Sequence, residues 1–170
     1  ERFDDFLSPF FPQNTFESLE KKLLITATDI VNANVRVFEK GPLIPAILAS
    51  AALPGIFTPV PLENSLYSDG GVLDNFPLQP LLNEPMVILG SYVCPLKKLN
   101  VSDFRNSFNV VDRAVNLMMH NASLEKFPQC NLVFSPEELE EFGLFKTGQA
   151  ERIFQIGYEH AHQVLDASNI

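Results

Sequence analysis

The chain has 170 residues, of which 46% are hydrophobic and 19% charged, a composition typical of a globular domain with a sizeable core. Its net charge of −9 argues against nucleic acid or an anionic membrane as an electrostatic partner, and leaves open binding to a lipid surface through apolar side chains. No stretch approaches the roughly 18 consecutive apolar residues that a membrane span needs. The two cysteines, Cys94 and Cys130, show no metal-ligand spacing, and we expect buried free thiols.

Apolar patterning predicts that strands and helices alternate along the chain. Continuous apolar runs indicate buried strands, whereas apolar residues three and four apart indicate helices. The expected elements, in chain order, are a short helix capped by Asn14 or Thr15 and running through Leu19, strands at 23–28 and 35–38, a helix at 42–52, a strand at 86–93, a helix over about 104–122, a strand at 131–134, a helical turn from Pro136 and a helix from about 148 to 167. This order predicts an α/β fold with helices on both faces of a mostly parallel sheet.

Two of these helices have further features. The clearest is expected to begin at an N-cap formed by Ser102 or Asp103. Its apolar side chains recur at three- and four-residue intervals, as Phe104, Phe108, Val111, Val115, Met118 and Ala122. The 42–52 helix is rich in small residues, which let a helix approach a sheet closely. Glutamates at 137–141 are expected to form a solvated helix face.

A carboxylate on a glycine-rich turn is the strongest candidate for a functional group. Asp69 precedes Gly70 and Gly71, after a short apolar stretch that predicts a strand. Alone, Asp-Gly-Gly is a common tight turn, because glycine adopts positive φ and Asp bonds to its own backbone two residues on. Asp29, at the end of a predicted strand, and the nearby Asp74 are weaker candidates.

The sequence on both sides of this turn extends the pattern. Residues 49–60 read A-S-x-A-x-P-G-x-F-x-P-V, and residues 67–77 read Y-x-D-G-G-x-x-x-N-x-P. Together they resemble the second half of a patatin-like phospholipase domain. The resemblance implies a three-layer α/β/α fold with a mostly parallel central sheet, of which residues 1–170 form the C-terminal part of a single domain.

The same resemblance implies a function. It indicates a lipid acyl hydrolase, of phospholipase A, lysophospholipase or esterase type, in which Asp69 is the acid/base partner of a nucleophilic serine. Gly70 and Gly71 would let the backbone turn sharply and leave room for substrate, and Asn75 would give structural support. Asp29 matches an Ala-Thr-Asp segment of the family that we interpret as structural. The substrate would be a lipid or acyl ester, and no metal or organic cofactor is implied.

The nucleophile itself is missing from the sequence. In this family it lies in Gly-x-Ser-x-Gly, and no serine here fits; Ser91 follows Gly90 but has Leu89 and Val93 at the flanking positions. We expect it in an upstream part of the same domain. A partner chain that supplies the serine is the weaker alternative, because a sheet split between chains leaves open edges.

Other interpretations stay open at this stage. The chain is alternatively a non-catalytic lipid-binding or regulatory module, or an unrelated domain whose Asp-Gly-Gly is only a turn. His120, His160 and His162 lack the spacing of a metal pair and are expected to be structural, although a triad with His120 is open in principle. The aromatic cluster Phe3, Phe6, Phe10 and Phe11 either packs in the core or lines an acyl-chain groove or lid.

The expected location follows from composition. Few cysteines and a simple soluble composition fit a cytoplasmic bacterial protein, in contact with membranes only peripherally. Expected partners are the lipid or acyl-ester substrate and the upstream part of the domain that carries the nucleophile, and no nucleic acid is expected.

Overall fold

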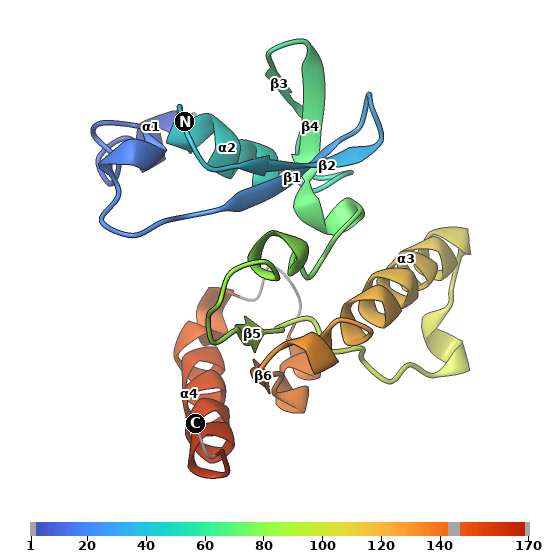
Figure 1. Ribbon diagram of the computed structural model, residues 1–170. Helices are drawn as coiled ribbons and strands as arrows, with labels where there is room; N and C mark the ends of the chain where they lie inside the picture. Colours follow the sequence, from blue (N-terminus) through green and yellow to red (C-terminus); the bar gives the residue numbers. More distant parts are fainter. Residues whose placement is uncertain (1–2, 143–146, 169–170) are drawn as a thin grey trace. The chain divides into compact units, whose positions relative to one another are not determined.

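The chain divides into two structural units, Glu1–Pro80 and Leu81–Ile170, each with its own sheet (Figure 1). The computed structural model describes residues 3–142 and 147–168. The organisation of residues 1–170 as part of a single domain stays a prediction. None of the helices in the described ranges is long and apolar enough to cross a membrane.

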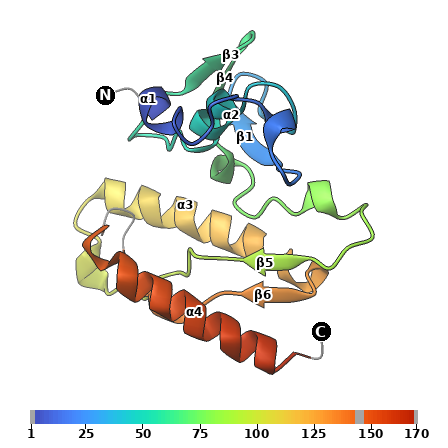
Figure 2. The same cartoon turned by 90° about the vertical axis from the view of Figure 1, so that its left-hand side faces the viewer.

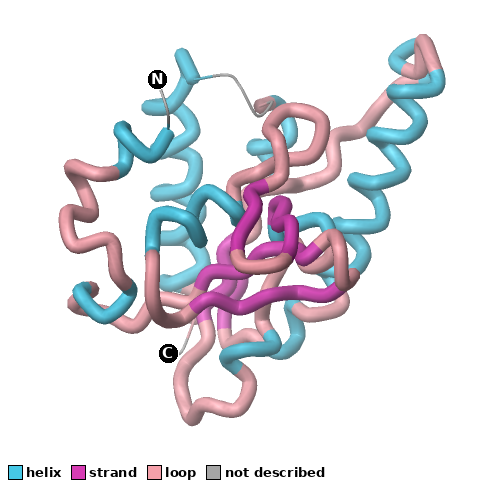
Figure 3. Tube along the Cα trace, turned by 90° about the horizontal axis from the view of Figure 1, so that it is seen from above, coloured by secondary structure: helices cyan, strands magenta, loops and turns pink. Residues whose placement is uncertain are grey.

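The first unit contains a four-stranded sheet in the order β2-β1-β4-β3, drawn in magenta in Figure 3. Its strands are β1 (Ile25–Asp29), β2 (Asn34–Phe38), β3 (Val60–Leu62) and β4 (Ser65–Asp69). All three pairings are antiparallel, so the expectation of a mostly parallel sheet is wrong here. For two of the pairings the reason lies in the connections: short turns join β1 to β2 and β3 to β4, whereas parallel neighbours need a crossover of about a dozen residues or more.

Helix α2 (Leu43–Ser50) packs against this sheet, close to where the sequence predicts a helix of small residues. Ala46 and Ala49 are fully buried, and Ala49 shares a core cluster with Ala27 of β1 and Tyr67 of β4. Alanine at these positions lets the helix backbone lie close to the strands, because no longer side chain separates them. This part of the prediction is confirmed.

The chain before β1 differs from the predicted helix. Helix α1 covers Phe3–Leu7, and only a short 3₁₀ turn, Phe16–Ser18, forms where a helix to Leu19 is expected. The Thr15 side chain makes no capping bond there. The amide oxygen of Asn14 instead accepts the Ile44 N–H at 2.7 Å. Asn14 thus caps α2, whose first position is preceded by a proline with no capping group.

The second unit is built on two parallel strands, β5 (Leu89–Ser91) and β6 (Leu132–Phe134). The crossover between them contains α3 (Ser107–Leu124), and α4 (Ala150–Asp166) follows β6. Figure 2 shows the two helices on either side of the strand pair. The sheet is parallel here, as predicted, although β5 is shorter than the expected 86–93 because β6 offers three residues for pairing. The three-layer arrangement stays a prediction.

The start of α3 also differs from its prediction. Its N-cap is Asn106, whose side chain accepts the Asn109 N–H at 3.1 Å. Ser102 and Asp103 belong to a separate 3₁₀ turn, Val101–Asp103, which a reciprocal pair of bonds between Asn100 and Asp103 closes. The glutamates expected on a helical turn form the 3₁₀ helix Glu137–Glu141.

Candidate functional site

Asp69 is the last residue of β4, and its backbone is fixed from two sides. On one side it lies opposite Ala27 of β1 in the antiparallel register. On the other, its N–H donates to the Ala52 carbonyl at 3.0 Å, and the Ser68 hydroxyl donates to the same carbonyl at 2.7 Å. Ala52 follows the end of α2, so helix and sheet together determine where the strand stops. The sequence alone does not show that Ala52 anchors this turn.

The Asp69 carboxylate is half-buried and has one oxygen occupied. The Gly71 N–H donates to Oδ1 at 2.7 Å, which makes Asp69 the N-cap of the 3₁₀ turn Gly70–Val72. Among residues 3–142 and 147–168 no other hydrogen bond reaches this carboxylate, so Oδ2 is available to a further donor. A carboxylate with a fixed rotamer and one available oxygen can accept a proton from a group placed beside it.

Gly70 is required at this turn by a close contact with β1. A Cβ at this position would lie 2.8 Å from the Thr26 carbonyl oxygen and 2.9 Å from its Oγ1. Thr26 therefore leaves no room for a side chain at position 70, and the room for substrate expected beside the carboxylate stays a prediction. Gly70 does not have the positive φ that a glycine turn suggests.

The segment after the turn carries two buried apolar side chains. Asp74 Oδ1 accepts the Phe76 N–H at 3.1 Å, and Phe76 and Leu78 are buried. Asn75, which stands between Asp74 and Phe76 in the sequence, is half-buried. Its supporting role, like the catalytic role of Asp69, stays a prediction.

The alternative carboxylate, Asp29, has both oxygens occupied. Oδ1 accepts the N–H groups of Val31 and Asn32 at 3.0 and 2.9 Å and a short bond from the Ser65 hydroxyl. Oδ2 accepts the side-chain amide of Asn32 at 2.9 Å. These bonds, first from the Asn32 side chain and then from Ser65, lower the pKa of Asp29 to about 2. This geometry favours the interpretation of Asp29 as a structural residue that closes the β1–β2 turn.

The lowered pKa of Asp29 predicts a dependence of stability on pH. Because the folded-state pKa is about 2 and the ordinary value is about 3.9, the ionised carboxylate stabilises the fold above about pH 4 and this contribution is lost as the pH falls toward 2. We expect the melting temperature of Asp29→Asn to lie below that of the wild type at pH 7, by an amount that shrinks between about pH 4 and 2. Thermal unfolding of both proteins across this range measures the difference, and a constant difference would contradict the assignment.

Each histidine has a structural contact in the second unit. His120 Nδ1 lies 3.0 Å from the Tyr92 hydroxyl, and burial, followed by the charge of Arg113, lowers the pKa of His120. His160 Nε2 accepts the Ser135 N–H at 3.1 Å. The ring of His162 packs against that of Tyr158. Within the described ranges, no group of three or more His, Cys, Asp or Glu side chains is placed to hold a metal ion.

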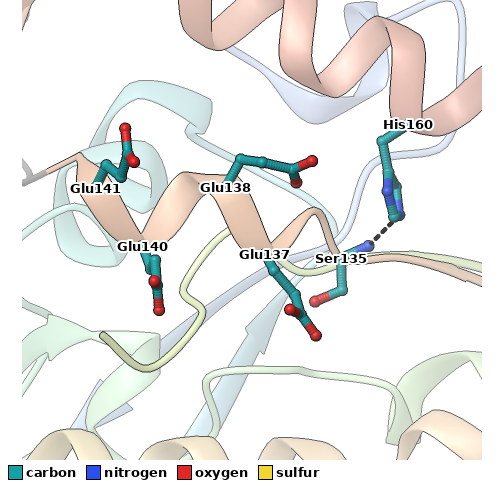
Figure 4. A pocket seen from close by; sticks show the side chains of 6 residues that line it. All are labelled: Ser135, Glu137, Glu138, Glu140, Glu141 and His160. Carbon is teal, nitrogen blue, oxygen red and sulfur yellow. Dashed lines mark hydrogen bonds between the residues drawn. The ribbon is translucent and has the colours of Figure 1, made fainter. Parts of the chain in front are cut away.

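A surface hollow of about 550 Å³ lies in the second unit and contains none of the predicted site residues. Figure 4 shows that its glutamates diverge: Glu137 and Glu140 point to one side of their 3₁₀ helix, and Glu138 and Glu141 to the other. Glu141 also forms an exposed ion pair with Arg152, at 3.2 Å. Diverging, hydrated carboxylates fit the solvated face that the sequence predicts, so Asp69 stays the better candidate.

Comparisons with known proteins agree with the motifs around Asp69. A family model described as patatin-like phospholipase matches residues 1–82. An uncharacterized NTE family protein of Mycobacterium tuberculosis (strain H37Rv) is 38% identical over 65 residues, which are 38% of this chain and 18% of the relative. A second NTE family protein of that organism is 29% identical over 76 residues, or 45% of this chain and 13% of the relative. The chain thus matches less than a fifth of the length of these relatives. Residues 1–82 thus match the patatin-like phospholipase family, as the motifs around Asp69 predict.

Proposed function

We propose that the protein is a lipid acyl hydrolase in which Asp69 is the acid/base of a Ser-Asp dyad. The observation that carries the proposal is the Asp69 carboxylate, which has a fixed backbone, one oxygen held by Gly71 and one oxygen available. It lies within the segment that matches the family model. Asp29, the competing carboxylate of the same sheet, has no such free oxygen because its turn uses both.

The chemistry assigned to Asp69 is proton transfer in two half-reactions. In the first, the available oxygen of Asp69 takes the serine hydroxyl proton while the serine oxygen attacks the ester carbonyl carbon. Asp69 then gives this proton to the departing alcohol, which leaves an acyl-serine. In the second, a water molecule gives its proton to Asp69, attacks the acyl carbon and releases the fatty acid as the serine regains a proton. A single carboxylate can perform both steps because it returns to its ionised form after each.

The Gly71 N–H contributes to this chemistry by orienting the base. A hydrogen bond to Oδ1 holds the side chain against the 3₁₀ turn and leaves Oδ2 for a further donor. The serine oxygen would need to come within about 2.6–3.2 Å of Oδ2 in the working enzyme. We expect the serine in the upstream part of the same domain.

The test uses the full-length gene product with a fluorophosphonate probe, which reacts covalently with activated serines. We expect stoichiometric labelling, together with hydrolysis of p-nitrophenyl esters that the probe abolishes. A phospholipid and a lysophospholipid assayed side by side would then define the substrate class. A folded protein that binds lipid but neither takes the probe nor hydrolyses esters would refute the dyad and support the non-catalytic module.

A further inference from the structure

The apolar side of α3 points away from the rest of the second unit. We call Phe108, Val111, Val115 and Met118 of the helix, together with Phe104 just before it, the α3 stripe; all five side chains are exposed, with Phe108 at 82% and Met118 at 73%. The opposite side of the helix faces the unit. There His120 contacts Tyr92, and Ser123 is buried. None of the described elements of the second unit covers the stripe.

The charges around this stripe differ from those of the rest of the chain. Residues 85–124 contain four of the twelve basic side chains, Lys97, Lys98, Arg105 and Arg113, but only two of the twenty-one acidic ones, Asp103 and Asp112. Lys97, Lys98 and Arg105 are exposed. An apolar helix face in a cation-rich segment, in a protein of net charge −9, complements an anionic surface that the rest of the chain would repel.

Two other exposed apolar patches have mainly acidic side chains beside them. In α1, Phe3 and Phe6 are exposed, but Asp4 and Asp5 stand between them. In α4, the exposed Phe154 and Tyr158 belong to a helix with Glu151, Glu159 and Asp166 and a single arginine, Arg152. Carboxylates beside an apolar patch oppose its approach to anionic headgroups. Around the α3 stripe the basic side chains outnumber Asp103 and Asp112, and this balance distinguishes it from these two patches.

We propose that the α3 stripe docks on a lipid bilayer that contains anionic headgroups. Phe108 and Met118, the most exposed members, enter the boundary between headgroups and acyl chains, and Lys97, Lys98 and Arg105 lie at the headgroup phosphates. This inference rests on the proposed function, because the purpose of the docking is to bring a lipid hydrolase to its substrate. The docking itself needs no hydrolysis.

The experiment is co-sedimentation of full-length protein with vesicles of phosphatidylcholine alone or mixed with phosphatidylglycerol. We expect binding to the mixed vesicles that salt weakens. Phe108→Ser/Met118→Ser should lower the partition coefficient at least about tenfold, because two exposed apolar side chains no longer enter the bilayer. The matched control, Phe154→Ser/Tyr158→Ser, removes two exposed rings, at 64% and 53%, in acidic surroundings and should stay within about twofold of the wild type.

A second variant tests the electrostatic part. Lys97→Gln/Lys98→Gln should lower binding to mixed vesicles about tenfold or more and leave binding to phosphatidylcholine unchanged. Three outcomes would overturn the proposal: no vesicle binding by the wild type, normal binding by the stripe variant, or a stripe variant that melts several degrees lower or turns a dimer into a monomer. In the last case another part of the protein, or a second copy, covers the stripe.

Failure of the docking and failure of the chemistry give different results. Hydrolysis of a soluble short-chain ester, without vesicles, should be unaffected by the stripe substitutions. Normal ester hydrolysis without vesicle binding would refute the docking alone. Normal vesicle binding without any ester hydrolysis would refute the proposed function alone.

Discussion

Replacing Asp69 by asparagine is expected to lower kcat/KM for ester hydrolysis at least about a hundredfold, because loss of a general base costs on that order. The structure makes this substitution selective. The asparagine oxygen can still accept the Gly71 N–H, now made by Asp69 Oδ1 at 2.7 Å, and the side chain is of nearly equal size. The turn is retained, while the oxygen that would take the proton becomes an amide nitrogen. Steady-state kinetics of the full-length protein measure the loss.

The matched control is Asp74→Asn, which removes the same charge five residues further on. Asp74 Oδ1 accepts the Phe76 N–H, a bond that asparagine can also make. We expect its kcat/KM to stay within a fewfold of the wild type, and both variants to melt within a few degrees of it. Equal losses in the two variants would show that negative charge in this segment, rather than proton transfer by Asp69, matters for activity.

The local elements of the first unit could be predicted, but their pairing could not. Apolar runs indicate β1 and β2, and small residues indicate α2, because these signals depend on each segment's own side chains. Whether neighbouring strands run parallel depends on the connection between them. Here Asp29 closes a short turn with bonds to Val31 and Asn32, and the hairpin follows. A lone Asp at a strand end does not predict a hairpin turn, since such a residue is equally typical of a catalytic site.

The position of the candidate site could be predicted, whereas the reasons for its geometry could not. The motif predicts that Asp69 lies at the end of a strand and that Gly70 follows it in a turn. The anchoring by the Ala52 carbonyl and the contact between Gly70 and Thr26 depend on segments that are distant in sequence. The apolar period predicts a helix over most of α3, although Phe104 lies before it, yet a period does not say which side of a helix faces its own unit. In α3 the more polar side does so.

Gly70→Ala is expected to destabilise the first unit by about 1–3 kcal/mol, the usual cost of an added methyl group in a packed site. The new Cβ would lie 2.8 Å from the Thr26 carbonyl oxygen, and backbone on neighbouring strands cannot move aside as a flexible side chain can. Either β4 moves away from β1 or the turn changes, and each displaces Asp69. Thermal and denaturant unfolding should show the loss of stability, and activity should fall further than stability alone explains.

The matched control for this substitution is Gly157→Ala, in the interior of α4. A Cβ at Gly157 meets no atom within 4 Å, and alanine is the better helix former by about 0.5–1 kcal/mol, so this variant should be as stable as the wild type or more so. Adding Thr26→Ala to Gly70→Ala removes the 2.9 Å contact with Oγ1 but not the one with the carbonyl, so it should restore only part of the stability. Full restoration would mean that the threonine side chain, and not the backbone of β1, requires glycine beside the candidate base.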